Sequence, residues 1–374
     1  MKIAVNTRLL LEGRLEGLGW FTYQTMKRIV NDHPEHEFFF LFDRPYSKKF
    51  IFGDNVTPVV VHPPTRHPLL WYFWFEWALP RVFKRIQPDV FVSTDGYLSL
   101  RSKVRTVDVI HDINFEHYPN NIRWSMRRYL QYYFPRFAQR ADRIVTVSEY
   151  SKSDIAETYG INPNKIDVAY NGASNTFRPL SVIEKEQVRI EYSEGQPYFI
   201  YVGALLPRKN IARLLRAFDI FKTSTQSQVK MLIVGAKMFK TSDIYSTLKN
   251  LKYKNDVIFT GHLPQGKLEF TAGAALALTY VSYFEGFGIP LVEAMRADVP
   301  IITSNATSLP EVAGSAALLC DPFSEQSIAN AMVSMYSDDN LRIKLIAEGR
   351  KRCQLFNWDS TADALWKSII MCVE

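Results

Sequence analysis

The segment from Glu285 to Glu293, EGFGIPLVE, has the residue types of an anion-binding loop that leads into a helix. Its glycines let a ligand approach the backbone closely, and Pro290 suits the first turn of a helix. The amide N–H groups and positive dipole end of such a helix can bind a diphosphate, and the two glutamates can accept hydrogen bonds from sugar hydroxyls beside it. A tight turn with solvated carboxylates is the alternative, but two acids that bracket a helix start favour a binding site.

Two adjacent cations, Arg208 and Lys209, stand in the same half of the chain, after the apolar run Tyr198–Gly203. On a loop at the end of a strand they can neutralise a diphosphate leaving group, arginine through paired hydrogen bonds and lysine as a point charge. No Asp-x-Asp pair stands where it could hold a metal ion at the phosphates. The cations therefore predict phosphate chemistry that needs no metal, although a pair of this kind is more often simply solvated.

The Glu-x7-Glu spacing inside EGFGIPLVEAM resembles glycosyltransferase family 4, a retaining family of the GT-B architecture, and weaker motifs along the whole chain agree with it in order. The resemblance implies that Glu285 contacts the donor sugar, that Glu293 contacts the ribose, and that Arg208 and Lys209 bind the donor phosphates. It also implies a front-face reaction, in which the departing phosphate takes the proton of the acceptor.

The first half of the chain carries two further motifs that resemble those of the family. Gly17 and Gly19 resemble the glycine-containing loop that closes over the diphosphate, although Glu16 replaces a glycine that the family often has. His111 and Asp112, at the end of an apolar run, resemble a pair whose histidine lies close to the transferred sugar. The aspartate would orient the ring or bind acceptor hydroxyls. A purely structural role is the alternative for both motifs.

The complete predicted site has a catalytic group and a donor-binding group. The family pairs the nucleobase with backbone groups near Leu263, while Ser148 and Ser308 match family segments at the start of helices. We expect Glu285, His111 and Asp112 to act on the reacting sugar, and no residue to bind a metal. We expect the donor to contact Gly17, Gly19, Arg208, Lys209, Leu263, Gly286, Phe287, Gly288, Leu291, Val292 and Glu293.

Short runs rich in Val, Ile and Phe alternate with segments of helical period, such as Trp20–Val30 and Trp124–Arg140, which is the pattern of βαβ units. The expected strands of the first half are Lys2–Asn6, Glu37–Phe42, Val59–His62, Val90–Thr94, Thr106–His111 and Arg143–Ser148. Those of the second half are Tyr198–Gly203, Lys230–Gly235, Val257–Gly261, Ala277–Ser282, Pro300–Ser304 and Ala316–Cys320. We predict an α/β fold of the GT-B class, with two Rossmann-like doubly wound domains facing a central cleft.

The strand pattern restarts after residue 178, where a polar and charged stretch suits a domain junction. We expect an N-terminal acceptor-binding domain over residues 1–178 and a C-terminal nucleotide-sugar-binding domain over residues 179–357. Apolar residues spaced by three and four then predict a final helix over residues 358–374. In the family this helix crosses back onto the first domain.

The composition limits the classes of protein that the chain can represent. It has 374 residues, 47% of them hydrophobic, so each of two domains can bury a core, and its net charge of +7 favours anionic partners. Three cysteines without metal-ligand spacing predict no disulfide framework and fit a reducing compartment. The sequence shows no signal peptide and no apolar stretch of membrane-spanning length, so we expect a cytoplasmic protein.

The segment Leu69–Ile86, LLWYFWFEWALPRVFKRI, holds three of the seven tryptophans of the chain and ends in a basic stretch. Aromatic rings beside cations suit a membrane interface with anionic lipid, which would place the protein at the inner face of the membrane. The segment Tyr129–Tyr133, with its neighbouring arginines, would extend the same surface. A core helix with a solvated basic end is an equal alternative.

Taken with the resemblance, these features predict a hexosyltransferase that uses a GDP- or UDP-linked sugar, with GDP-mannose as the first choice. The expected acceptor is a glycan or lipid-linked saccharide in cell-surface polysaccharide synthesis, and no cofactor is expected. A sugar-nucleotide epimerase of similar two-domain fold is one alternative. The basic charge raises a nucleic-acid-binding protein as another, but the sequence offers no recognition helix, zinc spacing or aromatic RNA motif, so no nucleic-acid partner is predicted.

Overall fold

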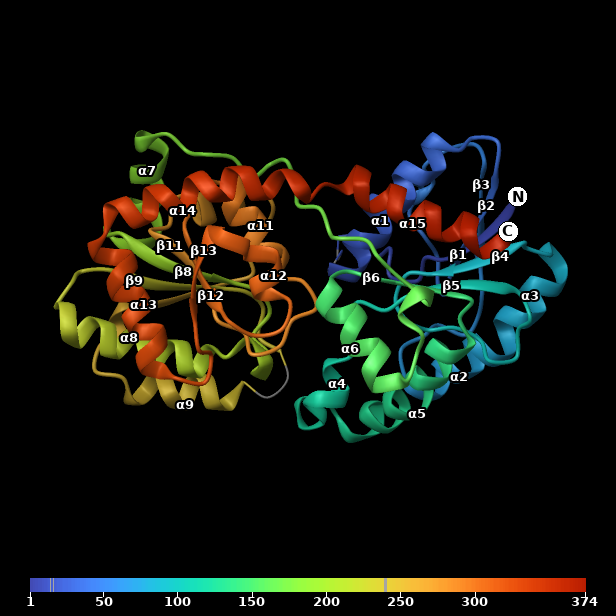
Figure 1. Ribbon diagram of the computed structural model, residues 1–374, viewed down its shortest axis with the longest axis horizontal. Helices are drawn as coiled ribbons and strands as arrows, with labels where there is room; N and C mark the ends of the chain where they lie inside the picture. Colours follow the sequence, from blue (N-terminus) through green and yellow to red (C-terminus); the bar gives the residue numbers. More distant parts are fainter. Residues whose placement is uncertain (14, 16, 239–240) are drawn as a thin grey trace. The chain divides into compact units, whose positions relative to one another are not determined.

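The computed structural model describes residues 1–13, 15, 17–238 and 241–374 of the chain. It divides into two compact units, of which the first comprises Met1–Asn171 with Asn357–Glu374 and the second comprises Gly172–Phe356. Figure 1 shows both, each with strands and helices in alternation. Glu16, which replaces a glycine of the resembled loop, lies outside the described residues.

Seven parallel strands form the sheet of the first unit, in the order β3-β2-β1-β4-β5-β6-β7. Their bounds are β1 (Lys2–Asn6), β2 (Glu37–Phe42), β3 (Val56–Val60), β4 (Val90–Ser93), β5 (Arg105–Val109), β6 (Arg143–Thr146) and β7 (Ile166–Val168). The short edge strand β7 was not predicted. Strand β3 begins earlier than predicted and includes Pro58. An edge strand tolerates this proline because the outer side of its backbone needs no N–H donor.

The helices of the first unit are α1 (Gly17–Asp32), α2 (Pro68–Phe73), α3 (Leu79–Ile86), α4 (Asn114–His117), α5 (Trp124–Arg140), α6 (Glu149–Tyr159) and α15 (Trp358–Val373). Ser148 caps α6, as expected, by accepting a hydrogen bond from the Ser151 amide at 3.0 Å. A π-helical turn, Trp74–Ala78, joins α2 to α3. No helix among the described residues is both long and apolar enough for a membrane span.

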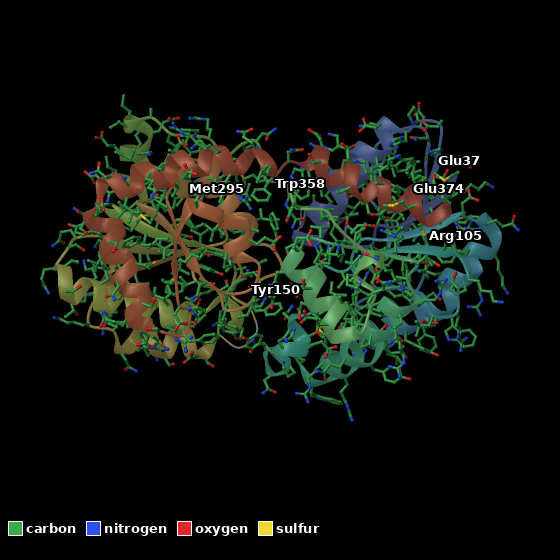
Figure 2. All side chains as sticks on the ribbon, in the orientation of Figure 1. Glu37, Arg105, Tyr150, Met295, Trp358 and Glu374 are labelled. Carbon is green, nitrogen blue, oxygen red and sulfur yellow. The ribbon has the colours of Figure 1, made fainter. Side chains whose placement is uncertain are left out.

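The last helix, α15, packs within the first unit, against α1 and the sheet. Trp358 and Glu374 mark its two ends in Figure 2. The Trp366 ring stacks on His33 at a centroid distance of 3.8 Å, and the Ser368 hydroxyl donates to Asp167 at 2.8 Å. The apolar spacing of the chain end therefore serves the core of the first unit.

The boundary between the units lies a few residues before the predicted one. The Thr176 hydroxyl donates to Glu269 at 2.9 Å and the Arg296 guanidinium donates to Asn175, so the segment after Asn171 belongs to the second unit. At the other crossing, Asn357 caps α15 and belongs with it. These side-chain contacts, which the polar composition of the junction did not reveal, determine where the units separate.

Six parallel strands form the sheet of the second unit, in the order β10-β9-β8-β11-β12-β13. Their bounds are β8 (Tyr198–Val202), β9 (Lys230–Val234), β10 (Val257–Gly261), β11 (Ala277–Tyr280), β12 (Ile301–Ser304) and β13 (Ala317–Cys320). The helices are α7 (Val182–Ser193), α8 (Ile211–Thr225), α9 (Ser242–Asn250), α10 (Leu268–Gly273), α11 (Ile289–Arg296), α12 (Leu309–Ala313), α13 (Glu325–Ser337) and α14 (Asp339–Arg352). Because β8 and β11 are parallel neighbours, the loops that follow them meet at one edge of the sheet.

Candidate functional site

The loop between β11 and α11 turns sharply before the helix begins at Ile289. Gly288 has φ of +99°, a conformation that favours glycine, and a Cβ atom there would approach Leu309 Cδ2 to 2.7 Å. The backbone angle therefore favours glycine, and a larger residue would also have to displace the end of the Leu309 side chain. Glu285 lies in this loop, between the end of β11 and the turn, at the edge of the sheet where the loop after β8 also lies.

Two hydroxyl side chains hold the backbone of this loop. Ser308 donates to the carbonyl oxygen of Glu285 at 2.9 Å and to that of Phe287 at 3.3 Å, while Thr307 accepts the Glu285 amide at 3.1 Å. Ser308 was expected only as the start of a helix. Its larger structural role is to fix the position of Glu285, which no local pattern in the sequence indicates.

The structure brings Glu285, Arg208 and Lys209 together in one buried ion cluster. Arg208 Nη1 lies 2.7 Å from Glu285 Oε2, and Lys209 Nζ lies 2.5 Å from Glu285 Oε1. Arg208 also donates to the Phe284 carbonyl at 2.9 Å, which ties it to the same loop. Each carboxylate oxygen thus faces one cation.

The loop that carries the two cations is fixed on its other side by Asn210. This residue has φ of +62°, and its amide nitrogen donates to the carbonyl oxygens of Val281 at 3.0 Å and Pro322 at 2.6 Å. Asparagine tolerates the left-handed conformation better than most residues. The cations are therefore presented from a short, anchored turn at the start of α8.

The cluster is ionised and carries one net positive charge. Burial alone would raise the pKa of Glu285, but the charges and hydrogen bonds of Arg208 and Lys209 outweigh it and lower this pKa to about 2. The carboxylate therefore stays ionised at neutral pH and neutralises one of the two cations. Such a site has the charge to receive a diphosphate, which would compete with Glu285 for the same N–H donors.

Glu293 lies about one turn inside α11 and is half-buried. Burial, together with the charge of Glu269, raises the pKa of Glu293 to about 7. The amide of Leu291, expected to face an anion, instead donates to the Gly288 carbonyl at 2.9 Å. The tight turn at Gly288 brings its carbonyl within reach of the first helical turn, and contact of Leu291 with the donor stays a prediction.

We expect replacement of Glu293 by glutamine to stabilise the protein at alkaline pH. The folded-state pKa lies above the ordinary value of 4.5, so the wild type loses stability as the pH rises from the lower value towards about 7. Glutamine cannot ionise and avoids this loss, which amounts to at most about 3 kcal/mol. Urea unfolding should show the gain at about pH 8 and little at about pH 4. An equal gain in stability at both pH values would contradict the raised pKa of Glu293.

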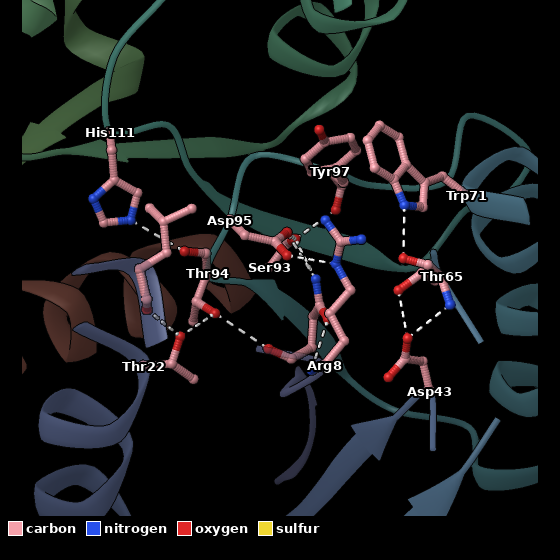
Figure 3. A network of polar contacts seen from close by, with 12 residues as sticks. Arg8, Thr22, Asp43, Thr65, Trp71, Ser93, Thr94, Asp95, Tyr97 and His111 are labelled. Atoms are coloured by element: carbon pink, nitrogen blue, oxygen red, sulfur yellow. Dashed lines mark hydrogen bonds and ion pairs between the residues drawn. The ribbon is translucent and has the colours of Figure 1, made fainter. Parts of the chain in front are cut away.

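In the first unit, His111 follows β5 and belongs to the network of polar contacts in Figure 3. Its Nε2 is 3.1 Å from the carbonyl oxygen of Thr94, and since a carbonyl only accepts, Nε2 carries the proton. The ring also meets Phe21 edge-on at 4.8 Å. Burial lowers the pKa of His111, so the neutral ring with an unprotonated Nδ1 predominates.

Asp112 does not orient this ring. Its carboxylate accepts hydrogen bonds from the Asn114 amide at 3.0 Å and from the Asn114 side chain at 2.5 Å. The side chain thus closes the turn into α4. Of the two roles that the sequence left open for Asp112, ring orientation is not seen, and binding of acceptor hydroxyls stays a prediction.

Gly17 and Gly19 are helical rather than part of a loop, which corrects the expectation that the helix begins at Trp20. A Cβ atom on Gly19 would lie 2.8 Å from the Leu9 carbonyl oxygen, so the close approach of this backbone requires glycine. Leu263 follows β10, half-buried, at the same edge of the second sheet as the loops after β8 and β11.

The predicted residues thus form two groups. Arg208, Lys209, Glu285 and the loop Gly286–Gly288 share one edge of the second sheet, whereas His111 and Gly19 belong to the first unit. Among the described residues, no group of three or more His, Cys, Asp or Glu side chains is arranged to hold a metal ion.

Comparisons with known proteins agree across both units. The family model described as glycosyl transferases group 1 matches residues 182–352, and that of glycosyltransferase family 4 matches residues 16–175. O-antigen chain mannosyltransferase B of Escherichia coli is 29% identical over 285 residues, which cover 76% of this chain and 74% of that protein. O-antigen chain mannosyltransferase RfbU of Salmonella typhimurium is 29% identical over 291 residues, which cover 77% of each chain.

Solved structures share the fold over the whole chain. The crystal structure of HepE of Anabaena in complex with UDP and glucose has a TM-score of 0.77 at 18% identity, over 99% of this chain and 100% of that chain. That of WaaG, a glycosyltransferase involved in lipopolysaccharide biosynthesis, has a TM-score of 0.74 at 16% identity, over 98% and 99% of the two chains.

Proposed function

Since this chain belongs to the group 1 and family 4 glycosyltransferases and has their GT-B fold, we propose that it transfers a hexose from a nucleotide-diphosphate sugar to a glycan or lipid-linked saccharide, with retention of configuration. Both halves of the chain match glycosyltransferase models, which favours this activity over the epimerase alternative. The proposed reaction forms a bond between the acceptor oxygen and C1 of the sugar and breaks the bond from C1 to the phosphate. The proton of the acceptor goes to the departing phosphate.

The observation that carries the proposal is the ion cluster of Arg208, Lys209 and Glu285. Negative charge develops on the diphosphate as it leaves, and cations held in place before the reaction stabilise it without reorganisation. Because two cations supply this stabilisation, we propose that transfer needs no divalent metal. When the diphosphate replaces Glu285 as the partner of Arg208 and Lys209, the carboxylate of Glu285 can accept hydrogen bonds from the sugar hydroxyls.

We propose GDP-mannose as the donor and an O-antigen-type polysaccharide precursor as the acceptor, with the reaction in the cytoplasm. The names of the two 29% identical relatives, both O-antigen chain mannosyltransferases, support the sugar and the class of acceptor. The complex of HepE with UDP and glucose supports a nucleotide-diphosphate donor site on this fold.

The function is tested by a screen of nucleoside diphosphates and their sugars. A nucleoside diphosphate that binds the native state should raise the melting temperature, and GDP should do so more than UDP or guanosine. With GDP-mannose and a mannose-terminated lipid-linked saccharide, the protein should release GDP. Absence of stabilisation by any nucleoside diphosphate, or isomerised donor without transfer, would contradict the proposal.

We also propose that the first unit touches an anionic membrane through α2, the π-helical turn and α5. One face of the segment Leu69–Ile86 belongs to the core of the first unit, and the other face is exposed. The buried side chains of that face are Trp71, Trp74, Phe75, Leu79, Phe83 and Ile86. The outer face, at intervals of four residues, exposes Leu69, Phe73 and Trp77.

The helix α5, which contacts α2, also exposes aromatic rings beside an arginine. Trp124 is 73% exposed and Tyr132 is also exposed, and the Arg136 guanidinium lies 3.7 Å from the centre of the Tyr132 ring. Exposed rings interleaved with arginines suit the interface of anionic lipid, where rings sit at the level of the headgroups.

The double variant Phe73→Ser with Trp124→Ser should therefore bind vesicles that contain phosphatidylglycerol at least about tenfold more weakly than the wild type. Its nucleoside diphosphate binding should not change. The matched control, Val182→Ser with Ile190→Ser, also removes two exposed apolar side chains, from α7 of the second unit, and should bind vesicles like the wild type. If both double variants bind vesicles equally well, this surface is not the membrane-binding surface.

A further inference from the structure

Tyr280, the last residue of β11, lies between two members of the ion cluster, and no motif in the sequence assigns it a role. Its hydroxyl oxygen is 2.5 Å from Lys209 Nζ and 3.0 Å from Glu285 Oε1. The side chain is almost completely buried. A polar group in such a place requires partners, and here both partners are charged groups of the candidate site.

The directions of the two hydrogen bonds follow from the chemistry of the partners. The Lys209 ammonium can only donate and the ionised Glu285 carboxylate can only accept, so the phenol accepts from the first and donates to the second. Burial, followed by the charge of Glu285, raises the pKa of Tyr280 well above its ordinary value. The phenol therefore keeps the proton that it donates to the carboxylate.

The arrival of a diphosphate changes what each member of the cluster needs. Phosphate oxygens are acceptors, so they can replace Glu285 as the partner of Arg208 and Lys209. The phosphate oxygens cannot donate to Glu285. This carboxylate is 5% exposed and would lose its two cationic donors, Arg208 and Lys209, to the phosphates. An ionised carboxylate that is buried with too few donors is costly. Of the three side chains that contact Glu285 in the cluster, only Tyr280 is an uncharged donor with no attraction to the incoming anion.

We propose that Tyr280 is a positioning residue of the donor site, whose hydroxyl keeps the Glu285 carboxylate and the Lys209 ammonium in place when the diphosphate of the donor displaces Glu285 from the two cations. This inference rests on the proposed function, since it assigns Tyr280 a role in the same reaction. It predicts that the hydroxyl matters most when the sugar is being transferred, because only then must Glu285 hold the sugar while the cations hold the phosphates.

The structure offers a matched control in Tyr201, on the neighbouring strand β8. The rings of Tyr201 and Tyr280 stack at a centroid distance of 6.0 Å with an angle of 8° between their planes, and both are buried. The Tyr201 hydroxyl donates to the Ala204 carbonyl at 3.2 Å and so serves the loop rather than the ion cluster. Tyr201→Phe thus removes the same atom from the same ring stack without removing a hydrogen bond to Glu285 or Lys209.

The test compares wild type, Tyr280→Phe and Tyr201→Phe in the release of GDP from GDP-mannose in the presence of acceptor. Each phenylalanine keeps the stacked ring, and melting temperatures check that both variants fold. We expect Tyr280→Phe to lower kcat by about tenfold or more, as for loss of a hydrogen bond to a charged group, with KM for the donor changed by less than about threefold. Tyr201→Phe should retain the kcat of the wild type.

Two results would overturn the role of Tyr280 while leaving the proposed function intact. One is an unchanged kcat in Tyr280→Phe. The other is an equal loss of kcat in both variants, which would indicate a general effect on the strand pair. A wild type that releases no nucleoside diphosphate from any sugar donor would instead contradict the proposed function, and the role of Tyr280 with it.

Discussion

Replacing Glu285 by glutamine should lower turnover by about a hundredfold or more and, in the same protein, tighten the binding of free nucleoside diphosphate. Turnover falls because glutamine lacks the charge that the proposed contact with the sugar provides. Binding of the diphosphate tightens because the wild-type carboxylate occupies Arg208 and Lys209 at 2.7 and 2.5 Å and competes with the ligand. The gain in affinity should be about tenfold.

The same variant should be less stable than the wild type when no ligand is bound. Two buried cations lose the charge that neutralises them, and breaking a buried ion pair on one side is costly. Addition of nucleoside diphosphate should restore the melting temperature, since the ligand supplies the missing anion. The ion cluster therefore predicts a lower melting temperature for the unliganded variant than for the wild type.

Glu325→Gln is the matched control for this variant. Glu325 also pairs with an arginine of the second unit, Arg216, at 2.5 Å, but outside the loops of the candidate site. The turnover of Glu325→Gln, measured by steady-state kinetics, and its affinity for nucleoside diphosphate, measured by calorimetry, should be close to those of the wild type. If Glu285→Gln keeps wild-type turnover, or binds nucleoside diphosphate more weakly than the wild type, the account of the ion cluster is wrong.

Removal of either cation should weaken the binding of a nucleoside diphosphate and leave the binding of the nucleoside almost unchanged. Arg208→Ala and Lys209→Ala each delete a charge-assisted donor to phosphate, and the loss in affinity for GDP should be about 10- to 100-fold. Guanosine has no phosphate, so its affinity should stay within about twofold. Titration calorimetry with both ligands measures the contrast.

Arg216→Ala provides the control for charge loss in the same unit, since its guanidinium pairs with Glu325 and Thr247 rather than with the site. It should change the affinity for neither ligand. Equal weakening of GDP and guanosine in Arg208→Ala or Lys209→Ala would show that these side chains support the fold of the loop rather than bind phosphate.

The parts of this molecule that follow local rules could be predicted from the sequence. Apolar runs located β8 and β11, and Pro290 indicated the start of α11, where the preceding Gly288 has a φ of +99° that glycine readily adopts. The adjacency of Arg208 and Glu285 is a consequence of strand order, since β8 and β11 pair directly. Only the resemblance to a family connected these two loops before the structure did.

Features set by tertiary packing could not be predicted. Glycine is a poor helix former, yet Gly17 and Gly19 lie in α1, and at Gly19 the helix passes so close to the Leu9 carbonyl that a Cβ atom would lie 2.8 Å from its oxygen. Tyr280 reads as one more apolar residue of a strand, and only the fold brings its hydroxyl to Glu285. Strand β7 has three residues, too few for any periodic signal.

The central claim is tested most directly by the product that the purified protein makes from GDP-mannose, whose mannose is α-linked, and a mannose-terminated saccharide acceptor in the presence of EDTA. Proton NMR of the purified product reports the anomeric configuration of the new bond. We expect an α-mannoside, formed at the same rate with and without the chelator, and formed at least about a hundredfold more slowly by Glu285→Gln. A β-linked product, or transfer that stops with EDTA and returns with Mn²⁺ or Mg²⁺, would contradict a retaining, metal-independent transferase.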